Sequence, residues 1–327
     1  MSQDVLQPGE IATLAQREIP RIILPRRDAL FADRAARLRA LAAGNPIAGY
    51  LELMATLAQA QHEALAALEQ AELQRLQQAA LAQQPPAARD AGMPPLEASS
   101  LHRDRAWRDL LRRLCARVAA TADAPEAVGT LLARLCAAAD DWLEAQADAL
   151  LGVPGARAEV DGAAAPFVMA GLQLHWTALA LAFDAHALRP MPDAPGLCPC
   201  CGSRPVASVV HASAPHAGYR YLACGLCGLQ WHFVRVQCSS CGGRGKDIAY
   251  QAMTPVDAGS EEAKATPVRA ETCDACHAYR KILYAEKDQA VEPLADDLAT
   301  LSLDMLLGEM GFQRASPNPM LWQAGDA

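Results

Sequence analysis

Residues 220–242 read RYLACGLCGLQWHFVRVQCSSCG and contain two Cys-x-x-Cys pairs on either side of an extended-looking stretch. Two further pairs flank this segment, so that eight cysteines form four such pairs between positions 198 and 276. The pairs are Cys198 with Cys201, Cys224 with Cys227, Cys238 with Cys241, and Cys273 with Cys276. Two tetrahedral metal sites built from four cysteine ligands each require this set of thiolates. The segment therefore predicts two metal sites.

Each pair fits a tight turn in which two thiolates bind one ion and backbone N–H groups point at the sulfurs. A glycine after the second cysteine eases the positive φ that such a turn needs. Gly202, Gly228 and Gly242 occupy this position, and His277 replaces the glycine in the fourth pair. Since each site already has four sulfurs, we expect His277 and the nearby His232 to lie outside the ligand set.

The spacing of the pairs favours sequential sites, with the first two pairs forming one site and the last two forming the other. The intervening segments of 22 and 31 residues are each long enough for a hairpin that brings its ends together. Residues 228–237 look extended, and ten extended residues span roughly 33 Å, which separates the second pair from the third. The crossed arrangement, first pair with third and second with fourth, stays open.

The spacing does not identify the metal. A tetrahedral sulfur site suits Zn²⁺ and mononuclear iron equally, and metal-free redox dithiols are a further alternative. Cys200, inside the first turn, either competes with Cys201 for ligation or faces solvent. Cys115 and Cys136 lie on apolar helical faces, where we expect small core residues.

Composition narrows the class of protein. The net charge of −8 over 327 residues argues against a general nucleic-acid or anionic-membrane binder, although positions 198–290 hold ten Lys/Arg against eight Asp/Glu. The N-terminus has no basic segment followed by an apolar one, which argues against a secretory signal. Residues 163–187 are apolar but include Gln173 and His175, so we expect a buried helix rather than a membrane span. We therefore predict a cytoplasmic protein, whose thiols stay reduced.

Periodicity of apolar residues predicts helices through the first 190 residues. Residues 47–83 predict one long helix or a helical pair, and residues 84–95, rich in proline and alanine, predict an exposed connection. We expect a further helix to begin near Ser99 and Ser100, which are good N-caps, and another to run through 166–188.

The pattern changes after residue 190. Short strands are expected at 206–211, 219–223 and 229–236, and a helix follows Pro293. Asp296 or Asp297 is expected to cap this helix, with Asp304 on a solvated face. The predicted fold class is α+β, an N-terminal all-α helical bundle followed by two tandem rubredoxin-like or zinc-ribbon modules and a C-terminal helix. The predicted domains are 1–190 (helical), 191–237 (first ribbon), 238–290 (second ribbon) and 291–327 (C-terminal helix and tail).

Four segments of the chain resemble the FdhE family of formate dehydrogenase accessory proteins. They are LPRRDALFADRAARLRALAAGNPIAGYL (24–51), APFVMAGLQLHW (165–176), the segment 220–242, and EPLADDLATLSLDMLLGEMGFQR (292–314). The resemblance implies a cytoplasmic protein that acts on the catalytic subunit of respiratory formate dehydrogenase before export. It also implies rubredoxin-like iron sites on the four cysteine pairs.

The leading hypothesis is a non-enzymatic maturation factor that binds the immature catalytic subunit. The sequence contains no nucleophile elbow, P-loop or dinucleotide-binding glycine motif. We expect no nucleic-acid partner and no stable membrane insertion, and self-association is possible. Two alternatives come from other classes, a rubredoxin-like electron carrier and a zinc-ribbon nucleic-acid-binding protein.

Overall fold

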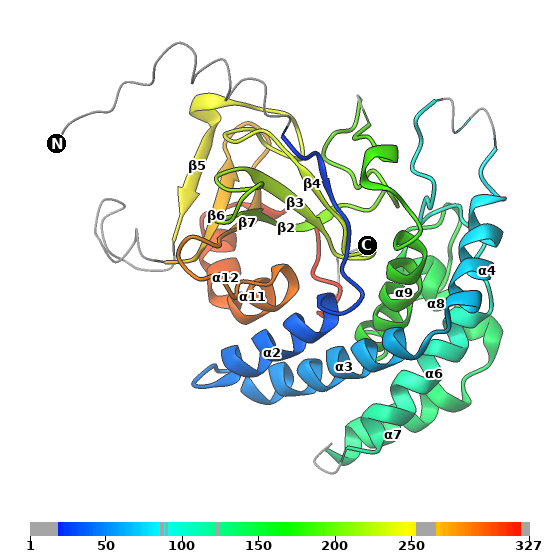
Figure 1. Cartoon of the computed structure of the whole chain (residues 1–327). Helices are drawn as coiled ribbons and strands as arrows, with labels where there is room; N and C mark the ends of the chain where they lie inside the picture. The colour runs from blue at the N-terminus through cyan, green and yellow to red at the C-terminus, as the bar shows by residue number, and fades with distance from the viewer. Residues whose placement is uncertain are drawn as a thin grey trace.

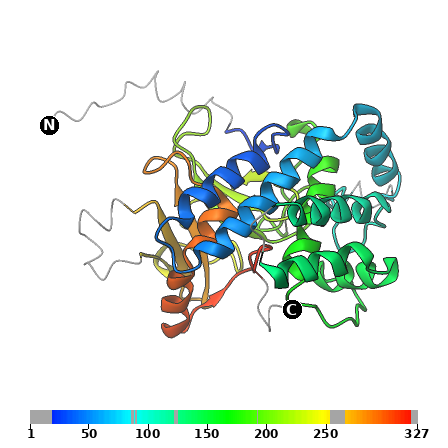
Figure 2. The ribbon, with the colours of Figure 1, turned by 90° about the horizontal axis from the view of Figure 1, so that it is seen from below.

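The computed structural model describes residues 19–85, 88, 91–121, 125–191, 193–252 and 266–321. A mixed β-sheet forms one part of the molecule, and helices pack beneath and beside it (Figure 1). Viewed from below, α2 and α3 run side by side across the molecule (Figure 2). This mixture of helix and sheet agrees with the predicted class. The outer ends of the predicted first and last domains, and part of the connection at 84–95, lie outside the described residues.

Seven helices precede the cysteine-rich region within the described residues. They are α2 (Leu30–Ala42), α3 (Ala48–Ala67), α4 (Gln70–Leu81), α6 (Ala106–Ala119), α7 (Glu126–Ala137), α8 (Asp140–Leu150) and α9 (Ala165–Ala180), with a short 3₁₀ turn η1 (Ala185–Ala187). Residues 47–83 thus form a helical pair, which is one of the two predicted outcomes. The expected helix start at Ser99 and Ser100 is wrong, because α6 begins at Ala106.

Helix α9 is the central helix of this part. All of its 16 residues are buried, and it packs against α3, α4, α6 and α8. Gly171 allows a close approach to α6, since a Cβ there would lie 2.9 Å from the Leu111 Cβ. The expectation of a buried helix is confirmed. No helix among the described residues has the length and apolarity needed to cross a bilayer.

The sheet combines strands from both cysteine-rich segments. Its strands are β1 (Ile22–Ile23), β2 (Pro205–Val210), β3 (Arg220–Cys224), β4 (Gln230–His232), β5 (Ile248–Gln251), β6 (Val268–Cys273), β7 (Ala278–Tyr284) and β8 (Gln313–Arg314), with a 3₁₀ turn η2 (Gly245–Asp247) before β5. The order is β1-β4-β3-β2-β7-β6-β5, and β8 pairs with the start of β7.

The two halves of the sheet repeat one unit. In each unit a cysteine pair is followed by two antiparallel strands, a second cysteine pair, and a third strand. The units join where β2 pairs in parallel with β7, with Ser208 opposite Ile282. The sequence predicts tandem modules, whereas the structure joins them in one continuous sheet. The N-terminal part is also not entirely helical, because β1 pairs with β4 at the sheet edge.

The predicted strand at 229–236 is shorter in the structure. Strand β4 covers three residues, and the chain then bends, with Val236 at φ 56°. The carbonyl of Val236 accepts a hydrogen bond of 3.3 Å from the Gly245 N–H. A positive φ is unusual for a β-branched residue, and nothing in the sequence pattern indicates it. The extended stretch assumed between the second and third cysteine pairs is therefore wrong.

Two helices, rather than one, follow the second unit: α11 (Pro293–Ala299) and α12 (Leu301–Glu309). Helix α11 is capped by Glu292, whose carboxylate accepts hydrogen bonds from the N–H groups of Leu294 and Ala295. The predicted cap at Asp296 or Asp297 is therefore wrong. Both aspartates are buried instead, at 1% and 0% exposure.

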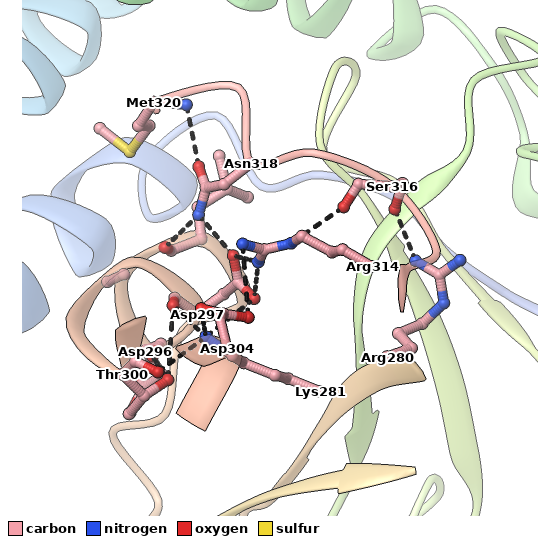
Figure 3. Close-up of polar contacts among 12 residues, drawn as sticks. Arg280, Lys281, Asp296, Asp297, Thr300, Asp304, Arg314, Ser316, Asn318 and Met320 are labelled. Carbon is pink, nitrogen blue, oxygen red and sulfur yellow. Dashed lines mark hydrogen bonds and ion pairs between the residues drawn. The ribbon is translucent and has the colours of Figure 1, made fainter. Parts of the chain in front are cut away.

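A buried ion network attaches α11 and α12 to the sheet (Figure 3). Lys281 of β7 donates to the Asp304 carboxylate and to the Asp297 carbonyl, each at 2.7 Å. The Asp297 carboxylate also pairs with Arg314 and accepts a 2.7 Å hydrogen bond from the Asn318 amide. Asp304 thus belongs to an interior network and not to the solvated face that the helical pattern predicts. This network fixes the position of the second unit relative to the C-terminal segment.

Candidate metal centres

The structure gathers the eight predicted cysteines into two groups of four. The first site contains Cys198, Cys201, Cys224 and Cys227, and the second site contains Cys238, Cys241, Cys273 and Cys276. Within each site the sulfurs all lie within 4.8 Å of one another. The structure therefore has the sequential arrangement, and the crossed arrangement does not occur. The bend at Val236, rather than a long strand, separates the two sites.

The sulfur spacing suits a tetrahedral ion. Cys198 and Cys227 Sγ are 3.6 Å apart and Cys201 and Cys224 Sγ are 3.5 Å apart. In the second site the Sγ atoms of Cys238 and Cys276 are 3.8 Å apart, and those of Cys241 and Cys273 are 3.6 Å apart. Metal–sulfur bonds of about 2.3 Å in a tetrahedron place sulfurs about 3.8 Å apart, whereas a disulfide requires about 2.05 Å. The donor set fits two four-coordinate soft-metal sites.

The turns have the conformation expected from the sequence. Gly202, Gly228 and Gly242 have φ values of 72°, 74° and 78°, and His277 takes the same region at 53°. Backbone N–H groups point at the sulfurs, as shown by the 3.4 Å bond from the Cys227 N–H to Cys224 Sγ. A similar 3.4 Å bond joins the Gly243 N–H to Cys241 Sγ. These N–H groups stabilise thiolate charge.

In each site hydrogen bonds lower the pKa of one thiol. Burial alone would raise the pKa of Cys224, but the hydrogen bonds accepted by its sulfur from neighbouring thiols and from the Cys227 N–H lower that pKa well below its usual range. In the second site the Gly243 N–H lowers the pKa of Cys241. Burial raises the pKa of Cys198 and of Cys227. In each site the sulfur with the lowered pKa is therefore the one whose thiolate form the surroundings favour.

The first site is bonded to the helical part of the chain. The Leu96 N–H donates to the Cys200 carbonyl at 2.9 Å, and the Ala98 N–H donates to the Cys201 carbonyl at 3.0 Å. On its other side, Leu96 accepts a 3.0 Å hydrogen bond from the Trp176 indole of α9. The segment before α6 therefore pairs with a cysteine turn instead of starting a helix.

A chain of buried amides makes a second connection. The Gln61 amide of α3 donates to Gln173 Oε1 at 3.1 Å, and the Gln173 amide of α9 donates to the Gly225 carbonyl at 2.7 Å. Gly225 lies between Cys224 and Cys227. Sequence reasoning used Gln173 only to exclude a membrane span. Its polar side chain within an apolar helix was the signal that it has a buried partner.

Cys200 is fully buried, which excludes the alternative in which it faces solvent. Its sulfur is not part of the four-sulfur group, in which Cys201 takes the ligand position. Cys115 is buried in the helical core and Cys136 is partly buried against it, as expected for small apolar residues. His232 and His277 lie outside both sulfur groups.

The second site contacts the loop at Gly196 and strand β8, whose Gln313 N–H donates to the His277 carbonyl at 2.7 Å, and it is also bonded to one arginine. Arg280 of β7 donates to the Ser239 hydroxyl at 2.9 Å and to the Ser316 hydroxyl at 2.8 Å. It also donates to the Pro205 carbonyl, at the start of β2. Arg280 thus connects the third cysteine turn with the first unit and with the C-terminal segment.

The fold and the sites define an α+β protein in which a sheet of two repeated units carries two four-cysteine sites. Family models for FdhE match nearly all of the chain. The N-terminal model covers residues 19–193, the central domain 197–235 and the C-terminal domain 236–321. The chain belongs to the FdhE family, the formate dehydrogenase accessory proteins that its sequence motifs resemble.

Individual relatives cover the chain almost completely. An FdhE homolog from Pseudomonas aeruginosa is 38% identical over 329 residues, covering 100% of both chains. Another from Serratia proteamaculans is 39% identical over 319 residues, covering 94% of this chain and 95% of its own length. The crystal structure of the FdhE protein from Pseudomonas aeruginosa superposes with a TM-score of 0.76 at 37% identity, covering 94% of this chain and all of that one.

Proposed function

We propose that the protein is a cytoplasmic, non-enzymatic accessory factor that prepares the catalytic subunit of respiratory formate dehydrogenase. Membership of the FdhE family supports this role. The observation that carries the proposal is the presence of two four-sulfur groups with tetrahedral spacing on a fold that matches a family member throughout its length. In this proposal the helices and sheet form a docking platform for the immature subunit.

The eight cysteines would hold two mononuclear iron ions, with Zn²⁺ as the alternative. Iron at such a site supplies one-electron chemistry, whereas zinc supplies only structure. The protein's own part is to hold four sulfurs at tetrahedral spacing and to direct backbone N–H groups at Cys224 and Cys241. These N–H groups favour the anionic form of the loaded site because four thiolates and a divalent ion carry a net negative charge.

One observation favours a second candidate, a rubredoxin-like electron carrier. Cys241 and Cys276 of the second site lie at the surface, where a redox partner has access. An electron carrier would serve several partners and would show no dependence on formate dehydrogenase. A reversible iron couple without any effect of gene deletion on formate oxidation would support this candidate over the first.

The proposed role is tested in a strain that lacks the gene. We expect loss of respiratory formate dehydrogenase activity with the catalytic subunit still synthesised, and recovery when the wild-type gene is returned. Full activity in the deletion strain would contradict the proposal. Immunoblotting of the catalytic subunit separates a maturation defect from loss of expression.

A further inference from the structure

We propose that the two sites have different roles: the first keeps its metal as a permanent part of the core, and the second exchanges its metal with external soft ligands at the surface. The class of ligand is a thiolate or comparable soft donor on a metal-donating or metal-accepting partner. This inference rests on the proposal that both sites bind metal. It assigns the exchange chemistry to one of them.

The two sites differ in burial although their sulfur geometry is alike. The first-site cysteines are 0–2% exposed and belong to the main hydrophobic core. In the second site Cys238 and Cys273 are buried, but Cys241 and Cys276 lie at the surface. Cys238 and Cys273 pack with Ile248 in a small separate cluster. An incoming ligand thus meets sulfur at the second site only.

The free space around the glycine that follows a cysteine pair shows how closely other segments pack on that turn. A Cβ on Gly202 would collide with the Glu97 carboxylate, and a Cβ on Gly228 would lie 2.5 Å from a Leu30 methyl carbon. At Gly242, in the equivalent position of the second site, the nearest group in the described part of the chain is the Gln237 amide at 3.9 Å. Other segments therefore cover the first-site turns, and the third cysteine turn is open on this side.

The segments that cover the first site are distant in sequence. They comprise Pro25 and the first residue of α2, the stretch before α6, helix α9 through Gln173, and Pro319, whose ring lies 2.9 Å from a Cβ placed on Gly225. Opening the first site must displace parts of the helical core. Opening the second site must displace turns whose neighbours in the described part of the chain include Gly196, Arg280 and Gln313, which lie outside the helical core. Local opening of a weakly packed turn needs far less free energy than global unfolding.

Exchange at the second site is a ligand substitution that needs no oxidant or reductant. The incoming thiolate donates an electron pair to the metal, a metal bond to Cys241 or Cys276 breaks, and repetition transfers the ion with its charge unchanged. The released cysteine sulfurs take up protons from water. Substitution of this kind requires direct access of the entering ligand, which the second site provides.

Release of Zn²⁺ from the full-length protein tests the proposal. Protein loaded with two equivalents of Zn²⁺ is mixed with an excess of a coloured zinc chelator. We expect one equivalent to be released rapidly, and the other at least about tenfold more slowly, with the slow phase accelerated by guanidinium at concentrations that unfold the helices. Release of both equivalents at one rate would overturn the division of roles. A chain that binds no metal of any kind would instead overturn the proposed metal function.

Matched cysteine variants show which site releases its Zn²⁺ in the fast phase and which in the slow phase. We expect Cys241→Ser to abolish the fast phase while it keeps one slowly released equivalent and the helical circular dichroism of the wild type. Loss of the slow phase in Cys241→Ser would overturn the proposal. Cys227→Ser is the counterpart in the first site, and we expect it to lose helical structure or thermal stability. If Cys227→Ser is instead as stable as the wild type, the first site is not part of the core as proposed.

Discussion

Single residues around the first site decide how firmly it is attached to the rest of the molecule. Gly228 and Gly242 have the same place in their turns and nearly the same φ, 74° and 78°. Their surroundings differ, because Leu30 and Pro25 cover Gly228, whereas the turn at Gly242 is open among the described residues. Alanine substitutions at these two glycines therefore distinguish the cost of backbone strain from the cost of overpacking.

We predict that Gly242→Ala lowers stability by about 1–2 kcal/mol, the cost of a left-handed backbone for alanine. Gly228→Ala adds overpacking against Leu30, so we expect a total loss of about 3 kcal/mol or more. Guanidinium unfolding of the metal-loaded proteins measures both values. Equal losses in the two variants would show that the contacts at Gly228 do not matter.

Gln173 provides a second test at this scale. Gln173→Leu removes the hydrogen bond to the Gly225 carbonyl and leaves the Gln61 amide without one acceptor. We expect a loss of about 2–3 kcal/mol, because both groups are buried. Gln59→Ala serves as the control. The Gln59 amide donates to Glu63 on its own helix, and we expect a change within about 0.5 kcal/mol. A Gln173→Leu variant as stable as the control would contradict this connection.

At the scale of elements, α11 and β7 depend on buried charge. Burial alone would raise the pKa of Asp297, but Lys281 and Arg314 outweigh it, so that its pKa is lowered in the folded protein. A carboxyl whose folded pKa is lowered stabilises the fold above its unfolded pKa of about 3.9, and this contribution is lost as the pH falls through the lower folded value.

We predict that Asp297→Asn is less stable than the wild type by about 3 kcal/mol at pH 7, because Lys281 and Arg314 lose a buried partner. The difference should shrink as the pH falls below about 4, where the carboxyl of the unfolded chain takes up its proton, toward the lower pKa of Asp297 in the folded protein. Thermal unfolding between pH 7 and pH 3 tests this, with Glu309→Gln as the exposed control in α12. A difference that does not depend on pH would contradict the electrostatic explanation.

Local pattern predicts many of the elements. The buried helix α9 follows from its apolar composition, the helical pair α3–α4 is one of the two outcomes that periodicity allows, and spacing favours the sequential grouping of the cysteines that the structure has. The segment at Ser99 and Ser100 has good capping residues, yet Leu96 and Ala98 bond to the first cysteine turn. Asp296 and Asp297 likewise have cap-like positions, but Glu292 takes the cap and the aspartates meet distant cations. These partners are far away in sequence, so local pattern does not indicate them.

For the whole molecule, spacing predicts two sites but not how they are embedded. The β2–β7 pairing joins both units in one sheet. The outer edge of the first unit is formed by β1, which lies about 180 residues upstream of β2 in the chain. The difference in exposure between the sites follows from these long-range contacts. Two cysteine sets that are built from the same kind of Cys-x-x-Cys pair therefore have different surroundings.

Our main proposal is that the eight cysteines form two metal sites with four sulfur ligands each. X-ray absorption at the metal edge, measured on anaerobically purified full-length protein, tests it most directly. We predict an iron edge and a first shell of four sulfurs at about 2.3 Å, with no nitrogen or oxygen ligand. A zinc edge with the same four sulfurs would support the two four-sulfur sites and identify their metal as zinc instead of iron. A mixed shell with nitrogen or oxygen, or the absence of bound metal, would contradict the account.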